Sequence, residues 1–175
     1  MRKPLTPQEV LDLDQALIEA FASHQAIKRR VPAARHIKFP QVPAVLGESF
    51  VIATASKLFG PDWKASFGGP LCDVRLVGST GQTRRVEVKS TARHGFQEFK
   101  AKDLSADTLV WIHFGKRFLE GCGALQIVIL DNPGKHISRP TRLDIPRLMR
   151  WVGDTPDLRQ IEVDDLKTFL FSSKW

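Results

Sequence analysis

The sequence predicts an α/β fold in which helices flank a central mixed β-sheet, and two kinds of segment support this prediction. Residues 109–114 and 125–130 are apolar at nearly every position, which is typical of strands covered on both faces of a sheet. Segments with helical spacing precede them, from Thr6 to about His24 and from about Pro43 to Phe59. Strands and helices therefore alternate along one chain, as in an α/β domain.

The first helix has a well-defined start. Thr6 is placed as the N-cap, Pro7 occupies the first helical position, and Glu9 is placed to complete a capping box. An apolar stripe with spacings of three and four follows, at Val10, Leu13, Leu17 and Phe21. Helical spacing also recurs over 96–104 and, more weakly, over 146–152 and 163–171. Residues 28–38, which are basic and interrupted by prolines, are expected to form an extended loop.

Two further strands are expected over Leu71–Val77 and Arg84–Thr91. Gly78-Ser79-Thr80-Gly81-Gln82 separates them and resembles a hairpin connection, so we expect antiparallel neighbours. Alternate side chains of a strand share a face, which directs Val86 and Val88 into the core and Glu87 and Lys89 together to the other side.

Length and composition are those of one globular domain. The chain has 175 residues, of which 42% are hydrophobic and 26% charged, without a low-complexity run. We expect a helical N-terminal segment (1–42), a core (43–131) and a C-terminal helical extension (132–175). Cys72 and Cys122 have no neighbouring metal-ligand motif, so both are expected to be buried thiols.

The charge balance favours a polyanionic partner. The formal net charge is +7 and the sequence pI is about 9.7. Because the sequence has no lipid-anchor motif, nucleic acid is a better candidate than a membrane. The longest apolar runs have the length of strands, and the N-terminus lacks an apolar signal core, so a cytoplasmic protein without a membrane partner is expected.

One group of residues suits phosphodiester hydrolysis. If the hairpin pairs as expected, Asp73 lies opposite or diagonal to Glu87, and two carboxylates converge with Lys89. Two carboxylate oxygens can hold Mg²⁺, which keeps several waters and takes phosphate oxygens as further ligands. Val-Glu-Val-Lys alone is typical of any half-exposed strand, in which the two charges are a solvated pair. The interpretation therefore depends on Asp73.

In this stretch the chain resembles the PD-(D/E)XK nuclease superfamily, which includes most type II restriction endonucleases. The matching residues are Asp73, then Glu87 and Lys89 separated by Val88, and Glu48 in the preceding helix. The order of elements over about 43–131 also resembles the restriction-endonuclease-like αβββαβ core. One departure is that Cys72 stands where the family usually has a proline, with Pro70 two positions earlier.

The resemblance implies roles for these residues. Asp73 and Glu87 would bind Mg²⁺, with Mn²⁺ expected to substitute for it. Lys89 would act on the attacking water, and Glu48 would be an auxiliary acid. We therefore expect a metal-dependent hydrolase with four catalytic residues: Asp73, Glu87, Lys89 and Glu48.

Basic and polar residues outside this group are candidates for DNA contact, with solvated surface residues as the alternative interpretation. They are Lys28, Arg29, Arg30, Arg35, Lys38, Arg84, Arg85, Ser90, Arg93 and Gln97. A second basic series, Arg139, Arg142, Arg147 and Arg150, is more typical of a solvated surface. Trp111 and His113 lie on an apolar run and are expected in the core.

The expected function is a Mg²⁺-dependent endonuclease that hydrolyses DNA phosphodiester bonds. The restriction endonuclease-like interpretation predicts a homodimer whose two active sites address both strands of double-stranded DNA. Two alternatives stay open at this point. One is a structure-specific, junction-resolving nuclease, and the other is a non-catalytic DNA-binding module with a nuclease fold.

Overall fold

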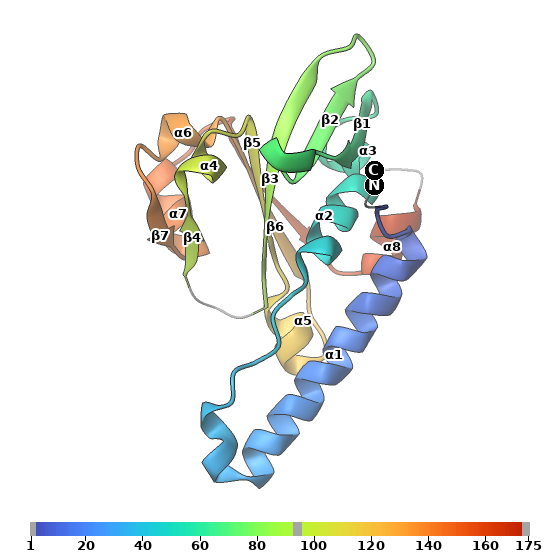
Figure 1. The fold of residues 1–175 in the computed structure, drawn as a ribbon, viewed down its shortest axis with the longest axis vertical. Coiled ribbons are helices and arrows are strands. Elements are labelled where there is room, and N and C mark those ends of the chain that lie inside the picture. The colour runs from blue at the N-terminus through green and yellow to red at the C-terminus, as the bar shows by residue number, and fades with distance from the viewer. Residues whose placement is uncertain (1–2, 93–95, 173–175) are drawn as a thin grey trace.

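A six-stranded mixed sheet forms the centre of the protein (Figure 1), as seen in a computed structural model that describes residues 3–92 and 96–172. Its strand order is β1-β2-β3-β5-β6-β8, and β3 with β5 is the parallel pair. The strands are β1 (Trp63–Phe67), β2 (Val74–Gly78), β3 (Thr83–Thr91), β5 (Thr108–His113), β6 (Leu125–Asp131) and β8 (Leu158–Val163). The predicted α/β class, with a mixed sheet between helices, is confirmed.

Helices and a small second sheet cover the two faces of this central sheet. The helical elements are α1 (Pro7–Arg30), η1 (Pro32–His36), α2 (Ala44–Ala53), α3 (Ala55–Phe59), η2 (Gly69–Leu71), α4 (Ala101–Leu104), α5 (Gly115–Glu120), α6 (Pro133–His136), α7 (Ile145–Val152) and α8 (Leu166–Phe171). The second sheet pairs β4 (Gln97–Phe99) with β7 (Thr141–Leu143) in antiparallel fashion. Figure 1 shows α1, α2 and α8 on one side of the central sheet, with β4, β7 and α7 on the other.

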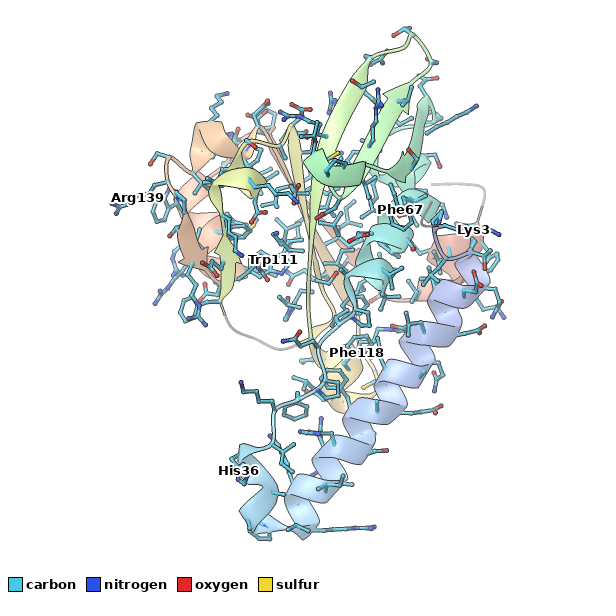
Figure 2. All side chains as sticks on the ribbon, viewed as in Figure 1. Lys3, His36, Phe67, Trp111, Phe118 and Arg139 are labelled. Atoms are coloured by element: carbon cyan, nitrogen blue, oxygen red, sulfur yellow. The ribbon has the colours of Figure 1, made fainter. Side chains whose placement is uncertain are left out.

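The central sheet separates two hydrophobic cores. The core on the α1 side includes Val110 and Ile112 of β5 together with Phe118 of α5. The core on the β4 side contains Leu109 and Trp111 of the same strand (Figure 2). Every residue of β5 is buried because alternate positions serve different cores. This is why the sequence is apolar throughout the strand, as predicted, and the expected core positions of Trp111 and His113 are confirmed.

The first helix begins as predicted and ends later than predicted. The capping box between Thr6 and Glu9 is present, but α1 continues to Arg30 instead of ending near His24. The expected extended loop over 28–38 is therefore wrong in its first half, since residues 28–30 complete α1 and 32–36 form a 3₁₀-helix. Basic residues in the last turn favour this continuation because they complement the negative end of the helix dipole.

The second predicted helix is divided into α2 and α3 at Thr54. The backbone N–H of Thr54 donates to the carbonyl of Phe50, and its hydroxyl donates to the same oxygen at 2.7 Å. Such a side-chain bond to the preceding turn competes with regular helix geometry. The stop at Gly60 is confirmed, where φ is 107° and a residue with a side chain would be strained.

Four strands, β1, β4, β7 and β8, were not predicted from the sequence. Residues 97–99 of the expected 96–104 helix form β4, and α4 begins only at Ala101. Part of the expected C-terminal helical extension (132–175) is also strand, because β7 lies there and β8 joins the central sheet. The expected 163–171 helix begins at Leu166, after an N-cap at Asp165. β1 and β8 are the edge strands of their sheet, and their interleaved polar residues weaken the strand pattern.

A buried ion pair joins α1 to α5. Nε of Arg117 donates to both carboxylate oxygens of Asp14, at 3.0 and 2.9 Å. Asp14 is 1% exposed, so its charge depends on this partner. The pair fixes the position of α1 along the sheet.

Two other expectations concern the cysteines and the membrane. Cys72 is buried as predicted, but Cys122 is exposed, which corrects the expectation of two buried thiols. Cys122 lies between Gly121 and Gly123 in the turn after α5, and these two glycines have no side chains that could cover its thiol. Within residues 3–92 and 96–172, no helix combines the length and the apolar character needed to cross a membrane.

Candidate active site

Asp73 and Glu87 lie next to each other where β2 meets β3. Val74 pairs with Val86 in the antiparallel register, so Asp73, one residue before β2, falls beside Glu87. Oδ2 of Asp73 accepts a hydrogen bond from the backbone N–H of Val88 at 2.9 Å. The cross-strand placement predicted from the sequence is therefore present, and a backbone bond holds the Asp73 carboxylate in position.

Glu87 is the most enclosed charged group of the site. It is 1% exposed, and neither carboxylate oxygen has a hydrogen-bond partner of good geometry within the described residues. Burial, followed by the negative charge of Asp73, raises the pKa of Glu87 to about 7. This carboxyl group therefore changes its charge near neutral pH.

The cation at this pair of carboxylates is Lys102 of α4. Its Nζ lies 3.2 Å from Oε1 of Glu87 and 3.7 Å from Oδ1 of Asp73. Burial lowers the pKa of Lys102, but the ion pair with Glu87 and the negative charges of both carboxylates outweigh that effect, so the pKa is raised. The side chain of Lys102 is 53% exposed, which leaves it free to approach or leave the carboxylates from solvent.

Lys89 has a different partner from the one predicted. Its Nζ lies 2.8 Å from Oδ1 of Asp103, whose side chain is 3% exposed. The other oxygen of Asp103 accepts from the backbone N–H of Lys100 at 2.8 Å and so caps α4. The sequence predicted that Lys89 converges with Asp73 and Glu87, whereas the structure pairs it with Asp103. Lys102 is the lysine that pairs with the two carboxylates.

Glu48 reaches the same region from α2. It is 6% exposed and lines a cavity of about 410 Å³ together with Asp73, Cys72, Ser66 and Phe67. Burial raises the pKa of the Cys72 thiol, and the charges of Glu87 and Asp73 add to that effect. The cavity therefore brings the predicted auxiliary acid and Asp73 to one opening in the surface.

A divalent cation would find two carboxylates here. Among the described residues, no group of three or more His, Cys, Asp or Glu side chains has the arrangement of a metal site. Mg²⁺ does not need one, since it is often held by one or two carboxylates and keeps several waters. The buried carboxylate of Glu87 has a second carboxylate beside it and Lys102 within ion-pair distance of both, and this arrangement fits such an ion chemically.

The residues predicted to contact DNA are spread over the molecule. Lys28, Arg29 and Arg30 lie at the end of α1, which Figure 1 shows at the opposite end of the molecule from the β2–β3 hairpin. His36 marks this end in Figure 2. Arg84 contacts Asp131 at 3.7 Å, and Arg85 contacts Asp107 at 3.3 Å. Arg84 and Arg85 thus form ion pairs with acids of the same chain, and they do not form one basic surface with residues 28–30.

The remaining predicted contacts lie nearer the carboxylates. Ser90 follows Glu87 on β3, and Lys38 lies across a cavity of about 490 Å³ from it. Gln97 on β4 lines a neighbouring cavity of about 670 Å³. Arg93 and the side chain of Arg35 lie outside the described parts of the chain.

Sequence reasoning missed Lys102 and Asp103. The spacing of 96–104 placed Lys102 on the polar side of a helix, without a sign of its partners. The sequence contained one indirect signal. Two close carboxylates in a buried position require a cation, but several lysines could have supplied it.

No family model, no curated protein sequence and no solved structure matches this chain. The interpretation of the site therefore rests on its own residues and geometry.

Proposed function

We propose that this chain is a Mg²⁺-dependent endonuclease that hydrolyses DNA phosphodiester bonds, with Asp73 and Glu87 as its metal ligands. The observation that carries the proposal is the side-by-side placement of these carboxylates, one fixed by the N–H of Val88 and the other buried. Placing two like charges together at the end of a strand is unfavourable for folding alone, so a cation-binding role accounts for their presence.

The metal has a defined part in this proposal. When bound, Mg²⁺ lowers the pKa of a water and offsets negative charge on the phosphate. Asp73 and Glu87 would hold it with one or two oxygens each, and Glu48 would act from the adjoining cavity as an auxiliary acid. Mn²⁺, which accepts the same oxygen ligands, is expected to substitute.

Two lysines, Lys102 and Lys89, share the role that the PD-(D/E)XK pattern assigns to a single lysine. Lys102, which contacts both carboxylates, balances their charge before a metal or a phosphate arrives. Lys89 is held 2.8 Å from Asp103 at the base of α4, and thereby keeps that helix over the site. We propose that Lys89 orients the attacking water once the substrate phosphate competes with Asp103 for its ammonium group.

The resemblance to PD-(D/E)XK enzymes supports this function through residue types and their order. Asp73 precedes β2, Glu87 and Lys89 lie on β3, and Glu48 lies on the helix before them. The net charge of +7 is consistent with a polyanionic substrate. A restriction endonuclease-like homodimer acting on double-stranded DNA in the cytoplasm is the form that we propose first.

One observation favours a second candidate, a non-catalytic DNA-binding module. Lys102 pairs with both carboxylates and Lys89 pairs with Asp103, so the charged groups of the site already compensate one another. A chain that never binds metal would be stable with this arrangement. The two candidates differ in one measurable property, the cleavage of DNA with Mg²⁺.

Incubation of purified protein with supercoiled plasmid and MgCl₂ tests the proposal. We expect nicked and linear products with Mg²⁺, and intact plasmid with EDTA. Asp73→Asn and Glu87→Gln should each lower the cleavage rate by about 100-fold or more, the usual scale for losing several kcal/mol of metal-based stabilisation. Glu120→Gln, an exposed glutamate at the end of α5, is the matched control and should cut normally. Full cleavage by either site variant would refute the assignment.

A further inference from the structure

The residue immediately before β4 carries an exposed aromatic ring with two arginines beside it. Phe96 is 43% exposed, although most phenylalanines of the described chain are buried or half-buried. Cζ of Arg147 lies 4.8 Å from the centre of its ring, and Cζ of Arg142 lies 5.6 Å from it. These three side chains, here called the Phe96 platform, come from the residue before β4, from β7 and from α7, so tertiary structure assembles them.

The Phe96 platform borders two cavities. One, of about 670 Å³, is lined by Phe96, Gln97, Glu98, Pro140, Thr141 and Arg142. The other, of about 490 Å³, shares Phe96 and Arg142 with the first and extends to Lys38, Ser90 and Thr91. Phe96 and Arg142 therefore line open space in both cavities.

Positive charge predominates at this surface. Arg142 and Arg147 lie over the ring, and Lys38 lines the second cavity together with Phe96. Two acids lie close to these arginines: Glu98 is opposite Arg142 in the β4–β7 register, and Asp144 caps α7 and lies 3.8 Å from Arg147. A ligand that combines an anionic group with a flat apolar part would therefore suit this surface, where guanidinium groups lie over the Phe96 ring.

The second cavity also reaches the strand that carries the proposed metal site. Ser90 and Thr91 line it and follow Glu87 on β3 by three and four positions. At about 3.3 Å per strand residue, the cavity lies roughly 10–13 Å from the Asp73–Glu87 pair. The part of this cavity formed by Ser90 and Thr91 is therefore within the length of a few nucleotides from the carboxylates.

We infer that the Phe96 platform binds an unpaired base of a DNA strand, with Phe96 and the guanidinium planes stacking on the base and Arg142, Arg147 and Lys38 contacting phosphates. Stacking on aromatic rings and arginine planes is how proteins hold unpaired bases, whereas paired bases already stack on each other. The inference rests on the proposed function for its ligand, DNA. It adds that the substrate has a single-stranded part, as branched and structure-specific substrates do, so it favours the structure-specific nuclease over the restriction endonuclease-like form.

Binding without cleavage tests the inference separately from the nuclease activity. Fluorescein-labelled single-stranded DNA and a blunt duplex of the same sequence are titrated with wild-type protein in EDTA, at fixed salt. We expect tighter binding of the single strand. Phe96→Ala should weaken that binding by about 5- to 100-fold, the loss expected for one stacked base, and leave blunt-duplex binding unchanged. Phe96→Trp should retain binding, and Phe96→Leu should not.

Two controls separate stacking from other effects. Phe171→Ala removes another exposed phenylalanine, 54% exposed on α8, and should leave single-strand binding unchanged. A 2-aminopurine base moved stepwise along the strand should be quenched by wild-type protein at one position, and that quenching should disappear in Phe96→Ala. Thermal unfolding of each variant verifies that the fold is intact.

The outcomes distinguish this inference from the proposed function. If Phe96→Ala binds single-stranded DNA as wild type does, or if wild type does not prefer the single strand, the inference is wrong even where the enzyme cuts plasmid. If the expected binding losses occur but no DNA is cut with Mg²⁺, the Phe96 platform stands and the nuclease assignment fails.

Discussion

Nζ of Lys102 lies 3.2 Å from Oε1 of Glu87, so the buried carboxylate of β3 takes its counter-charge from α4 and not from Lys89, its neighbour on the same face of the strand. Lys89 instead lies 2.8 Å from Asp103, the residue that follows Lys102. Two consecutive residues of α4 thus bind two alternate residues of β3, with the charges reversed between the pairs.

The two lysines should respond differently to substitution. Lys102→Met removes the positive charge beside Glu87, so the pKa of Glu87 should rise further and the acidic limb of the cleavage–pH profile should move to higher pH. Lys89→Met leaves Asp103 buried without its cation, and should lower the free energy of unfolding by about 3–5 kcal/mol. Chemical denaturation of Lys102→Met and Lys89→Met compares their free energies of unfolding, and the cleavage rate of Lys102→Met across pH tests the shifted profile. Asp103→Asn combined with Lys89→Met should restore part of the lost stability; equal stability of the two single variants would contradict the assignment.

Glu87 should make the stability of the metal-free protein depend on pH. Its pKa is raised from 4.5 to about 7, so between these values the folded state holds a proton that the unfolded state has lost. The free energy of unfolding should therefore fall as pH rises from about 4.5 to about 7, by an amount on the order of 3 kcal/mol, and then level off. Denaturation in EDTA across this range tests the slope, which Glu87→Gln should flatten. If the free energy of unfolding instead rises with pH in wild type but not in Glu87→Gln, the pKa of Glu87 is not raised.

Mg²⁺ should reverse that dependence. Because a metal ion and a proton compete for the Glu87 carboxylate, MgCl₂ should raise the melting temperature more at pH 8 than at pH 5.5. At 100 times its dissociation constant, the ion would add about 2.7 kcal/mol, or roughly 5–11 °C at 2–4 °C per kcal/mol. Differential scanning calorimetry with NaCl of equal ionic strength as control measures the effect. Asp73→Asn should abolish it, and an equal shift in that variant would place the ion elsewhere.

The ion pair between α1 and α5 gives a prediction about the fold alone. Arg117→Met leaves the 1% exposed carboxylate of Asp14 without its partner, and should cost about 3–5 kcal/mol in the free energy of unfolding. Asp14→Leu combined with Arg117→Met removes both charges and should recover most of that loss. Urea denaturation of these two variants and of Asp14→Leu alone completes the double-mutant cycle. If Arg117→Met is as stable as wild type, Asp14 is compensated by other groups.

The sequence contained local information about the site and lacked its long-range part. The register of one hairpin places Asp73 beside Glu87, and the short connection over 78–82 makes that register predictable. Lys102 reaches these carboxylates, and Asp103 reaches Lys89, only because the chain returns from the end of β3 to start β5. Nothing in the spacing of residues 96–104 encodes that return.

The same division holds for the fold. β5 and β6 were predicted because both their faces are buried and their sequences are apolar throughout. β8, at the edge of the sheet, has Arg159, Gln160 and Glu162 among its six residues and lacked such a pattern. β4 pairs with β7, which follows it by more than forty positions, so no local signal distinguished that short strand from a helical turn.

The parallel pairing of β3 with β5 also determines when the charges of this region meet during folding. The β2–β3 hairpin can close early because its connection is short, and it brings Asp73 beside Glu87 before Lys102 is in place. Lys102 reaches them only when the crossover chain with β4 and α4 has docked and β5 has been added beside β3, and Asp103 then reaches Lys89. The ion pairs of α4 therefore stabilise the completed topology and not the isolated hairpin, in which the two carboxylates repel each other.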